Sequence, residues 1–242
     1  MDARLSRSGV VKTKLLWFSL ILLVVWAMKR YYSAAGADDL WWILGPTARL
    51  AGGTAVGFVA EPGTGYLCRE RMFLIGKSCA GLNFMIAAFA MLAFTLRRRV
   101  VSCASGAHVL AGCLLAAYAA TVMVNAARIA IAMWLAAHPL TMSRLTPAQV
   151  HRLEGVIVYF VGLVLLHELI PGEHGVKYKF LRACTPLAFY YAVTLGLPLA
   201  NGAGGVAFVQ HALVVLAVPL MLMVLFCAAA VGRGRHLSPD TT

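Results

Sequence analysis

Apolar residues in this chain are gathered into long blocks. Blocks of about 15 to 24 residues can cross a hydrocarbon core of about 30 Å as α-helices. No segment has the strict alternation of apolar and polar positions that is typical of a strand, so no sheet is predicted. The pattern predicts an all-α, polytopic membrane bundle of about six transmembrane helices, at residues 15–28, 80–96, 104–124, 147–170, 184–200 and 207–231. We expect a single integral-membrane domain over residues 1–242.

The stretch 40–60 is apolar, but its content argues against a further span. Pro46 and Arg49 lie near its centre, and Gly52 and Gly53 follow. Irregular backbone at membrane depth is tolerated only where protein or a cavity covers it. We therefore expect this stretch to be interfacial or re-entrant at the outer face of the membrane.

The composition supports a membrane location and excludes two other classes of protein. The chain is 61% hydrophobic and only 12% charged, with a mean hydropathy of +0.81. Soluble domains have about 25% charged residues. Neither an ordinary cytosolic globule nor a disordered chain fits these values, and the lipid bilayer becomes the first expected partner.

The charge pattern predicts an orientation. Lys and Arg number 21 against 9 Asp and Glu, a formal net charge of +12. Basic clusters follow three apolar blocks, at 97–99, 177–182 and 233–235. Basic loops are retained in the cytoplasm, so the excess of Lys and Arg indicates how the helices are oriented in the membrane. No nucleic-acid partner is expected. We expect a multi-pass protein of the cell inner (cytoplasmic) membrane, with both termini in the cytoplasm.

This orientation places three segments on the outer, periplasmic side: 61–79, 125–138 and 143–151. The first contains Cys79. Ser78 is a suitable N-cap, which would place Cys79 in the first turn of a helix, where the dipole and Lys77 favour a thiolate. Gly81 would leave room for a substrate backbone, and Asn83 would share the helical face of Cys79 at i+4.

Two other interpretations of Cys79 remain open. A free cysteine is commonly a small buried apolar residue. A disulfide with Cys68, which the predicted orientation also places outside, is the second alternative.

The second outer segment contains Asn125 and Arg128 on one helical face. An arginine among alanines and aliphatic residues is costly in a membrane, so a partner or a function is expected. A side chain that extends to the headgroups from a helix end is the alternative.

The third outer segment contains His151. Thr146 and Gln149 fit a capping box, and Pro147 suits the first helical position. His151 then lies just over one turn inside the helix, with Gly155 at i+4 leaving one face open. An interfacial histidine with a satisfied hydrogen bond is the alternative. Glu154 is expected to be solvated, and binding to charged residues of a substrate or to headgroups is the alternative for it.

Cys79, Arg128 and His151 together indicate nucleophilic catalysis. A neutral imidazole can take the thiol proton, and a guanidinium can donate to the oxyanion of a tetrahedral intermediate. The reaction would form a thioester acyl-enzyme, and the acyl group would then be transferred to water or an amine. This chemistry requires no metal and no organic cofactor. A metal site at His167–Glu168 and Glu173–His174 is not favoured, because HExxH spacing is absent.

The patterns Cys79-Ala80-Gly81, Asn125-x-x-Arg128-Ile129 and His151-x-x-x-Gly155 resemble the exosortase/archaeosortase family. The resemblance covers about residues 40–170, and 171–242 would be additional C-terminal helices. Gly76 to Phe84 looks most like the exosortase K branch, whereas Ala80 departs from the serine of many members.

The resemblance implies a membrane-embedded cysteine endopeptidase or transpeptidase with Cys79, Arg128 and His151 as catalytic residues. Its substrates would be C-terminal sorting signals, such as PEP-CTERM tails, on exported membrane-tethered proteins. Asn83, Asn125, Gly81 and Gly155 are expected to bind substrate or support the site.

Two other functions remain open. A transporter or channel-like protein would use Arg128 as an intramembrane anion site. A non-catalytic scaffold for surface-polymer export would need none of the three residues.

Overall fold

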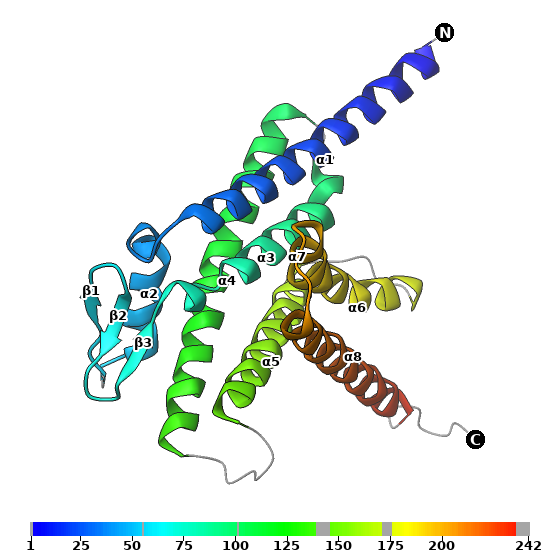
Figure 1. Cartoon of the computed structure of the whole chain (residues 1–242). Helices are drawn as coiled ribbons and strands as arrows, with labels where there is room; N and C mark the ends of the chain where they lie inside the picture. Colours follow the sequence, from blue (N-terminus) through cyan, green and yellow to red (C-terminus); the bar gives the residue numbers. More distant parts are fainter. Residues whose placement is uncertain (1, 55, 101, 139–145, 171–175, 236–242) are drawn as a thin grey trace.

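In the computed structural model, helices pack around a central helix, and one small sheet lies at one end of the bundle (Figure 1). The structure describes residues 2–54, 56–100, 102–138, 146–170 and 176–235. The α-helices are α1 Asp2–Ala34, α2 Trp41–Gly52, α3 Leu82–Thr95, α4 Cys103–Ala137, α5 Pro147–Glu168, α6 Val176–Tyr191, α7 Leu197–Ala200 and α8 Val206–Arg235. Short 3-10 turns are η1 Asp38–Leu40, η2 Lys77–Cys79 and η3 Leu96–Arg99, and a π-helical turn, η4 Ala192–Gly196, joins α6 to α7.

The helices confirm the predicted all-α membrane bundle. In the described part of the chain, five helices are long and apolar enough to cross a membrane, at Lys14–Ala34, Lys77–Thr95, Ala104–Ala137, Ala148–Glu168 and Val206–Phe226. The sixth predicted span corresponds to a shorter apolar helical stretch, Cys184–Ala200. Helix α2 has 12 residues and is therefore about 18 Å long, too short to cross, in agreement with the expectation for 40–60.

Helix α3 is the centre of the fold. It contacts α1, α4, α5 and α6, and most of its side chains are buried. Trp17 of α1 donates a hydrogen bond from Nε1 to the Ala93 carbonyl, at 3.3 Å. The ends of α1 and α4 and the starts of α3 and α5 point toward the lower left of the molecule (Figure 1). This antiparallel arrangement brings the chemically useful segments to one side of the bundle.

A three-stranded antiparallel sheet, which the sequence pattern did not predict, precedes α3. Its strands are β1 Val59–Glu61, β2 Gly65–Cys68 and β3 Phe73–Ile75, with Tyr66 opposite both Ala60 and Ile75. The expectation of no strands was wrong because three or four residues are too few to show an alternation. The sheet packs on α2 and leads directly into η2.

Helix α4 corrects a second prediction. The span predicted to end at residue 124 continues without a break to Ala137, a helix of 35 residues. Its last three turns are rich in alanine and contain no glycine or proline, so nothing interrupts the helix. Asn125 and Arg128 therefore lie within a helix rather than at its end. Similarly, the helix predicted from residue 184 begins earlier, at Val176.

Helices α4 and α5 approach each other closely at Gly162. A Cβ added at Gly162 would lie 2.8 Å from both Cγ atoms of Val124. We expect Gly162→Ala to lower the free energy of unfolding by about 1–3 kcal/mol through overpacking, measured by thermal unfolding in detergent. Val124→Ala in the same chain should restore most of that loss.

Gly112→Ala is the matched control, because an added Cβ there meets nothing within 4 Å. Alanine has the higher helix propensity, so this variant should unfold at the native temperature or above. Equal melting temperatures for the two alanine variants would contradict the close contact.

Candidate functional site

Cys79 lies at the end of the 3-10 turn η2, ahead of α3. Its N–H donates to the Gly76 carbonyl at 2.9 Å, and Gly81 adopts a left-handed conformation with φ of 70° before α3 begins at Leu82. The prediction that Ser78 caps a helix containing Cys79 was wrong. The left-handed Gly81 separates the short turn from the α-helix, a break that spacing alone does not show.

This break also separates Asn83 from Cys79. Asn83 is exposed, and its Oδ1 accepts a hydrogen bond from Nζ of Lys29 at 3.3 Å. The expected i+4 relation between Asn83 and Cys79 does not hold, since no continuous helix joins them. The amide that contacts the Cys79 segment belongs instead to Asn125, whose Nδ2 donates to the Cys79 carbonyl.

The Cys79 thiol is free and half-buried. Its Sγ lies 4.0 Å from the Ser78 hydroxyl. Cys68 is also free and fully buried in β2, so the alternative of a disulfide between the two cysteines is not formed. Lys77 is directed toward the end of α1, where it donates to the Ser33 carbonyl at 3.3 Å.

Arg128 is the centre of a buried polar network between α4 and α5. Arg128 is only 7% exposed. Nη1 donates to the Tyr159 hydroxyl at 3.0 Å, and Nη2 contacts Nε2 of His151 at 2.9 Å. Nε lies 3.7 Å from a carboxylate oxygen of Glu154. Arg128 thus has the partners that a buried arginine in an apolar helix requires.

Asn125 and Tyr159 connect this network to the Cys79 segment. The Tyr159 hydroxyl donates to Oδ1 of Asn125 at 2.8 Å, while the Asn125 amide holds the Cys79 carbonyl. The structure therefore brings Cys79, Asn125, Arg128 and His151 into one connected cluster.

His151 lies at the start of α5, and its side chain is 45% exposed. The predicted Thr146–Gln149 capping box and the proline at the start of this helix are both present. Arginine only donates hydrogen bonds, so Nε2 of His151 is the acceptor and the ring proton lies on Nδ1. Among the described residues Cys79 and His151 form no direct hydrogen bond, and Arg128 contacts the nitrogen that would take the thiol proton.

Two predicted glycines have structural roles here. An added Cβ at Gly155 would lie 3.3 Å from Nε of Arg128, so Gly155 allows the guanidinium to lie against α5. At Gly81 an added Cβ would lie 3.2 Å from Thr121 and 3.3 Å from Asn125. The space expected for a substrate beside Gly81 is filled by α4.

Glu154 and Tyr159 are site residues that sequence reasoning missed. The prediction that Glu154 is solvated was wrong, because its side chain is only 5% exposed. Its place one turn after His151, on the face of Gly155, was the available signal. Tyr159 is two turns from His151 and stacks on Phe84, with ring centroids 5.5 Å apart, and a tyrosine in an apolar helix gives no comparable signal.

The described residues contain no group of three or more His, Cys, Asp or Glu side chains that could hold a metal ion. Of the disfavoured metal motif, His167 is buried in α5, while Glu173 and His174 lie outside the described residues.

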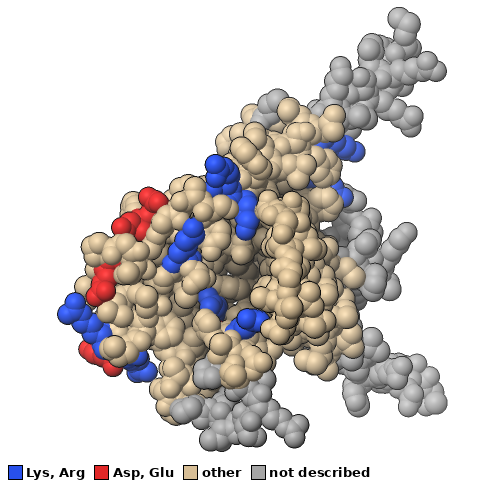
Figure 2. Space-filling model, viewed as in Figure 1, with Lys and Arg blue, Asp and Glu red and all other residues tan. Residues whose placement is uncertain are grey.

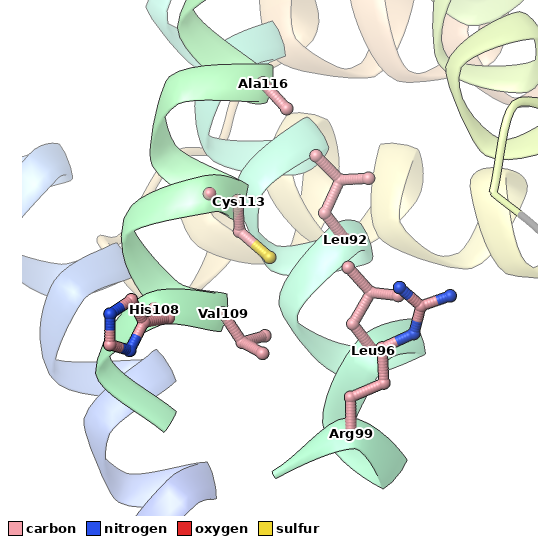
Figure 3. Close-up of a pocket in the computed structure, with 8 residues that line it drawn as sticks. Leu92, Leu96, Arg99, His108, Val109, Cys113 and Ala116 are labelled. Atoms are coloured by element: carbon pink, nitrogen blue, oxygen red, sulfur yellow. The ribbon is translucent and has the colours of Figure 1, made fainter. Parts of the chain in front are cut away.

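A cavity of about 270 Å³ lies elsewhere, between the end of α3 and the start of α4. Leu92, Leu96, Val109 and Ala116 form its apolar walls, and Arg99 and His108 lie at one end (Figure 3). None of the residues that line it belongs to the Arg128 network, so this cavity is separate from the candidate site.

On the face shown in Figure 2, Lys and Arg side chains surround a hollow near the middle of the molecule. The acidic side chains lie at the edge where α2 and the sheet are found, and further Lys or Arg side chains lie beside them. At this edge Arg69 lies 3.7 Å from Glu61, so acidic and basic side chains are mixed there.

Comparisons with protein-family models, with curated proteins and with solved structures found no match for this chain.

Proposed function

We propose that this membrane protein is a cysteine endopeptidase or transpeptidase that acts on C-terminal sorting tails of exported proteins. The observation that carries the proposal is the connected cluster in which Arg128 contacts His151 at 2.9 Å and Asn125 holds the Cys79 carbonyl. This cluster supports a site in which a nucleophile, a base and a fixed cation come from three different helical segments.

Each residue has a distinct role in the proposed reaction. Cys79 attacks the scissile carbonyl and forms a thioester as the amine leaves, and His151 takes the thiol proton and returns it to that amine. Arg128 stabilises the oxyanion of the tetrahedral intermediate. In the free protein Arg128 Nη2 donates a hydrogen bond to Nε2 of His151, the nitrogen that would take the proton. We therefore propose that substrate binding draws the guanidinium toward the oxyanion and frees the imidazole.

Asn125 and Tyr159 support this geometry. Asn125 fixes the backbone of the nucleophile, and Tyr159 joins Asn125 to Arg128 through hydrogen bonds of 2.8 and 3.0 Å. Preorganised groups of this kind reduce the reorganisation needed during the reaction.

The proposed setting is the cell inner membrane, with both termini in the cytoplasm and the site at the periplasmic side. Tails with a short motif, a hydrophobic helix and a basic cluster would enter from the bilayer. An anion-transport role for Arg128 is less well supported, because the guanidinium already contacts Tyr159, His151 and Glu154.

An exported reporter that ends in such a three-part tail tests the proposal. Cells that express the native protein should shorten the reporter, while a reporter without the short motif should remain intact. A membrane-impermeant thiol reagent applied to intact cells should modify Cys79 and stop processing. Processing that continues after Cys79 has been modified would contradict the proposal.

A further inference from the structure

Glu154 presents a buried carboxylate to both Arg128 and His151. Its Oε2 lies 3.7 Å from Nε of Arg128 and 3.6 Å from Nδ1 of His151. Neither carboxylate oxygen makes a hydrogen bond among the described residues, and Nε of Arg128 also lacks one. Burying an ionised carboxylate is unfavourable unless it is paired, so its place beside two nitrogens requires an explanation.

The contact between Arg128 and His151 suggests why the Glu154 carboxylate lies there. The two side chains meet at 2.9 Å, and Arg128 carries a positive charge throughout. When His151 takes a proton, a second positive charge appears beside the first. Two like charges at this separation repel strongly where water is excluded, and a base in this position needs a compensating negative charge.

We infer that Glu154 is the positioning residue that allows His151 to act as a base beside Arg128, an inference that rests on the proposed function. The Sγ–H bond of Cys79 breaks, the proton passes to Nε2 of His151, and the electron pair stays on sulfur. Nδ1 of His151 stays beside the Glu154 carboxylate, 3.6 Å away in the structure. Thiolate, imidazolium, guanidinium and carboxylate then sum to zero charge, whereas the cluster without Glu154 would be positive.

Position on the helix supports the same role. Glu154 is one turn beyond His151 on α5 and faces α4, so one carboxylate can orient both side chains. An orienting third group beside the catalytic base is the general arrangement of nucleophile–base sites. Gly155, the next residue, leaves the space through which Arg128 reaches this carboxylate.

Glu154→Gln in the full-length protein tests the inference, because it removes the charge and keeps the shape. With a purified tail peptide, kcat should fall at least about 100-fold, and KM should stay within about threefold. Glu154→Asp, which keeps the charge, should recover part of kcat. Should the glutamine variant fail to fold because Arg128 loses its charge partner, Glu154→Asp carries the test: the displaced carboxylate should lower kcat with KM unchanged, and native kcat would overturn the inference.

A double-mutant cycle distinguishes the positioning role of Glu154 from a purely structural role. If Glu154 acts through His151, then adding Glu154→Gln to His151→Ala should lower kcat no further. Additive losses would overturn the inference. Glu61→Gln is the matched control, because it removes a carboxylate 3.7 Å from an arginine in an exposed pair, and native kcat is expected.

Failure of the inference and failure of the proposed function give different results. Native kcat in folded Glu154→Gln, with tail cleavage by the native protein intact, overturns the inference alone. If the native protein does not cleave the tail at all, the proposed function fails and this role of Glu154 fails with it.

Discussion

Cys79→Ala is expected to abolish tail processing, with a loss of at least about 10⁴-fold in kcat. In the proposed reaction the thiol is the group that forms the covalent intermediate. The reporter should accumulate at full length in cells that express the variant. Immunoblotting of the reporter and of the variant gives the measurement and shows that the protein is present.

Cys68→Ala is the matched control for this prediction. Cys68 is a free cysteine in β2, fully buried and 11 positions before Cys79. Its replacement removes a thiol from the same segment without touching the site, so processing should continue. Normal processing by Cys79→Ala, or equal loss in both variants, would contradict nucleophilic catalysis by Cys79.

Arg128→Leu is expected to have the largest effect on stability. It leaves Glu154 buried without its arginine, and breaking a buried charge pair costs about 3–5 kcal/mol. It also removes the donor to Tyr159 and to His151. Thermal unfolding in detergent should show a clear decrease in the melting temperature, and tail cleavage should be lost.

The double variant Arg128→Leu with Glu154→Leu separates stability from activity. Replacing both members of a buried pair with apolar residues is often neutral or stabilising, so the melting temperature should recover while cleavage remains absent. Arg152→Leu, an exposed neighbour on α5, should change stability by less than about 0.5 kcal/mol. An Arg128→Leu protein as stable as the native one would show that the buried pair contributes little.

The sequence was sufficient for the parts of the fold that depend on long or strongly marked signals. Long apolar blocks predicted the membrane helices, and Thr146, Pro147 and Gln149 predicted the start of α5, which is confirmed. Pro46, Arg49 and the glycines that follow argued against a full span at 40–60, and the short helix α2 agrees with that expectation.

The errors share a physical cause, because each depends on contacts between distant segments or on a short local element. The strands at 59–75 are too short to give a pattern. The end of the Cys79 turn depends on the φ of Gly81, which packs against Asn125 and Thr121 of α4. Glu154 pairs with Arg128 of another helix, and Gly155 leaves the space for that contact.

The site was predicted in part for the same reason. The individual residues Cys79, Arg128 and His151 have unusual surroundings that a single sequence reveals. Their connections run through Asn125, which was expected to support the site, and through Tyr159, which was not. Asn83, the other asparagine expected in that role, contacts Lys29 instead.

One measurement tests most directly whether Cys79, Arg128 and His151 form one catalytic site. The native protein is mixed with a tail substrate and quenched in acid, and the mass of the peptide that contains Cys79 is measured. We predict that this peptide carries the acyl part of the substrate as a thioester, that hydroxylamine releases it, and that Arg128→Lys and His151→Ala greatly reduce its formation. Rapid substrate turnover with Cys79 unmodified at every time point, or the same acylation in the Arg128 and His151 variants, would contradict a shared catalytic site.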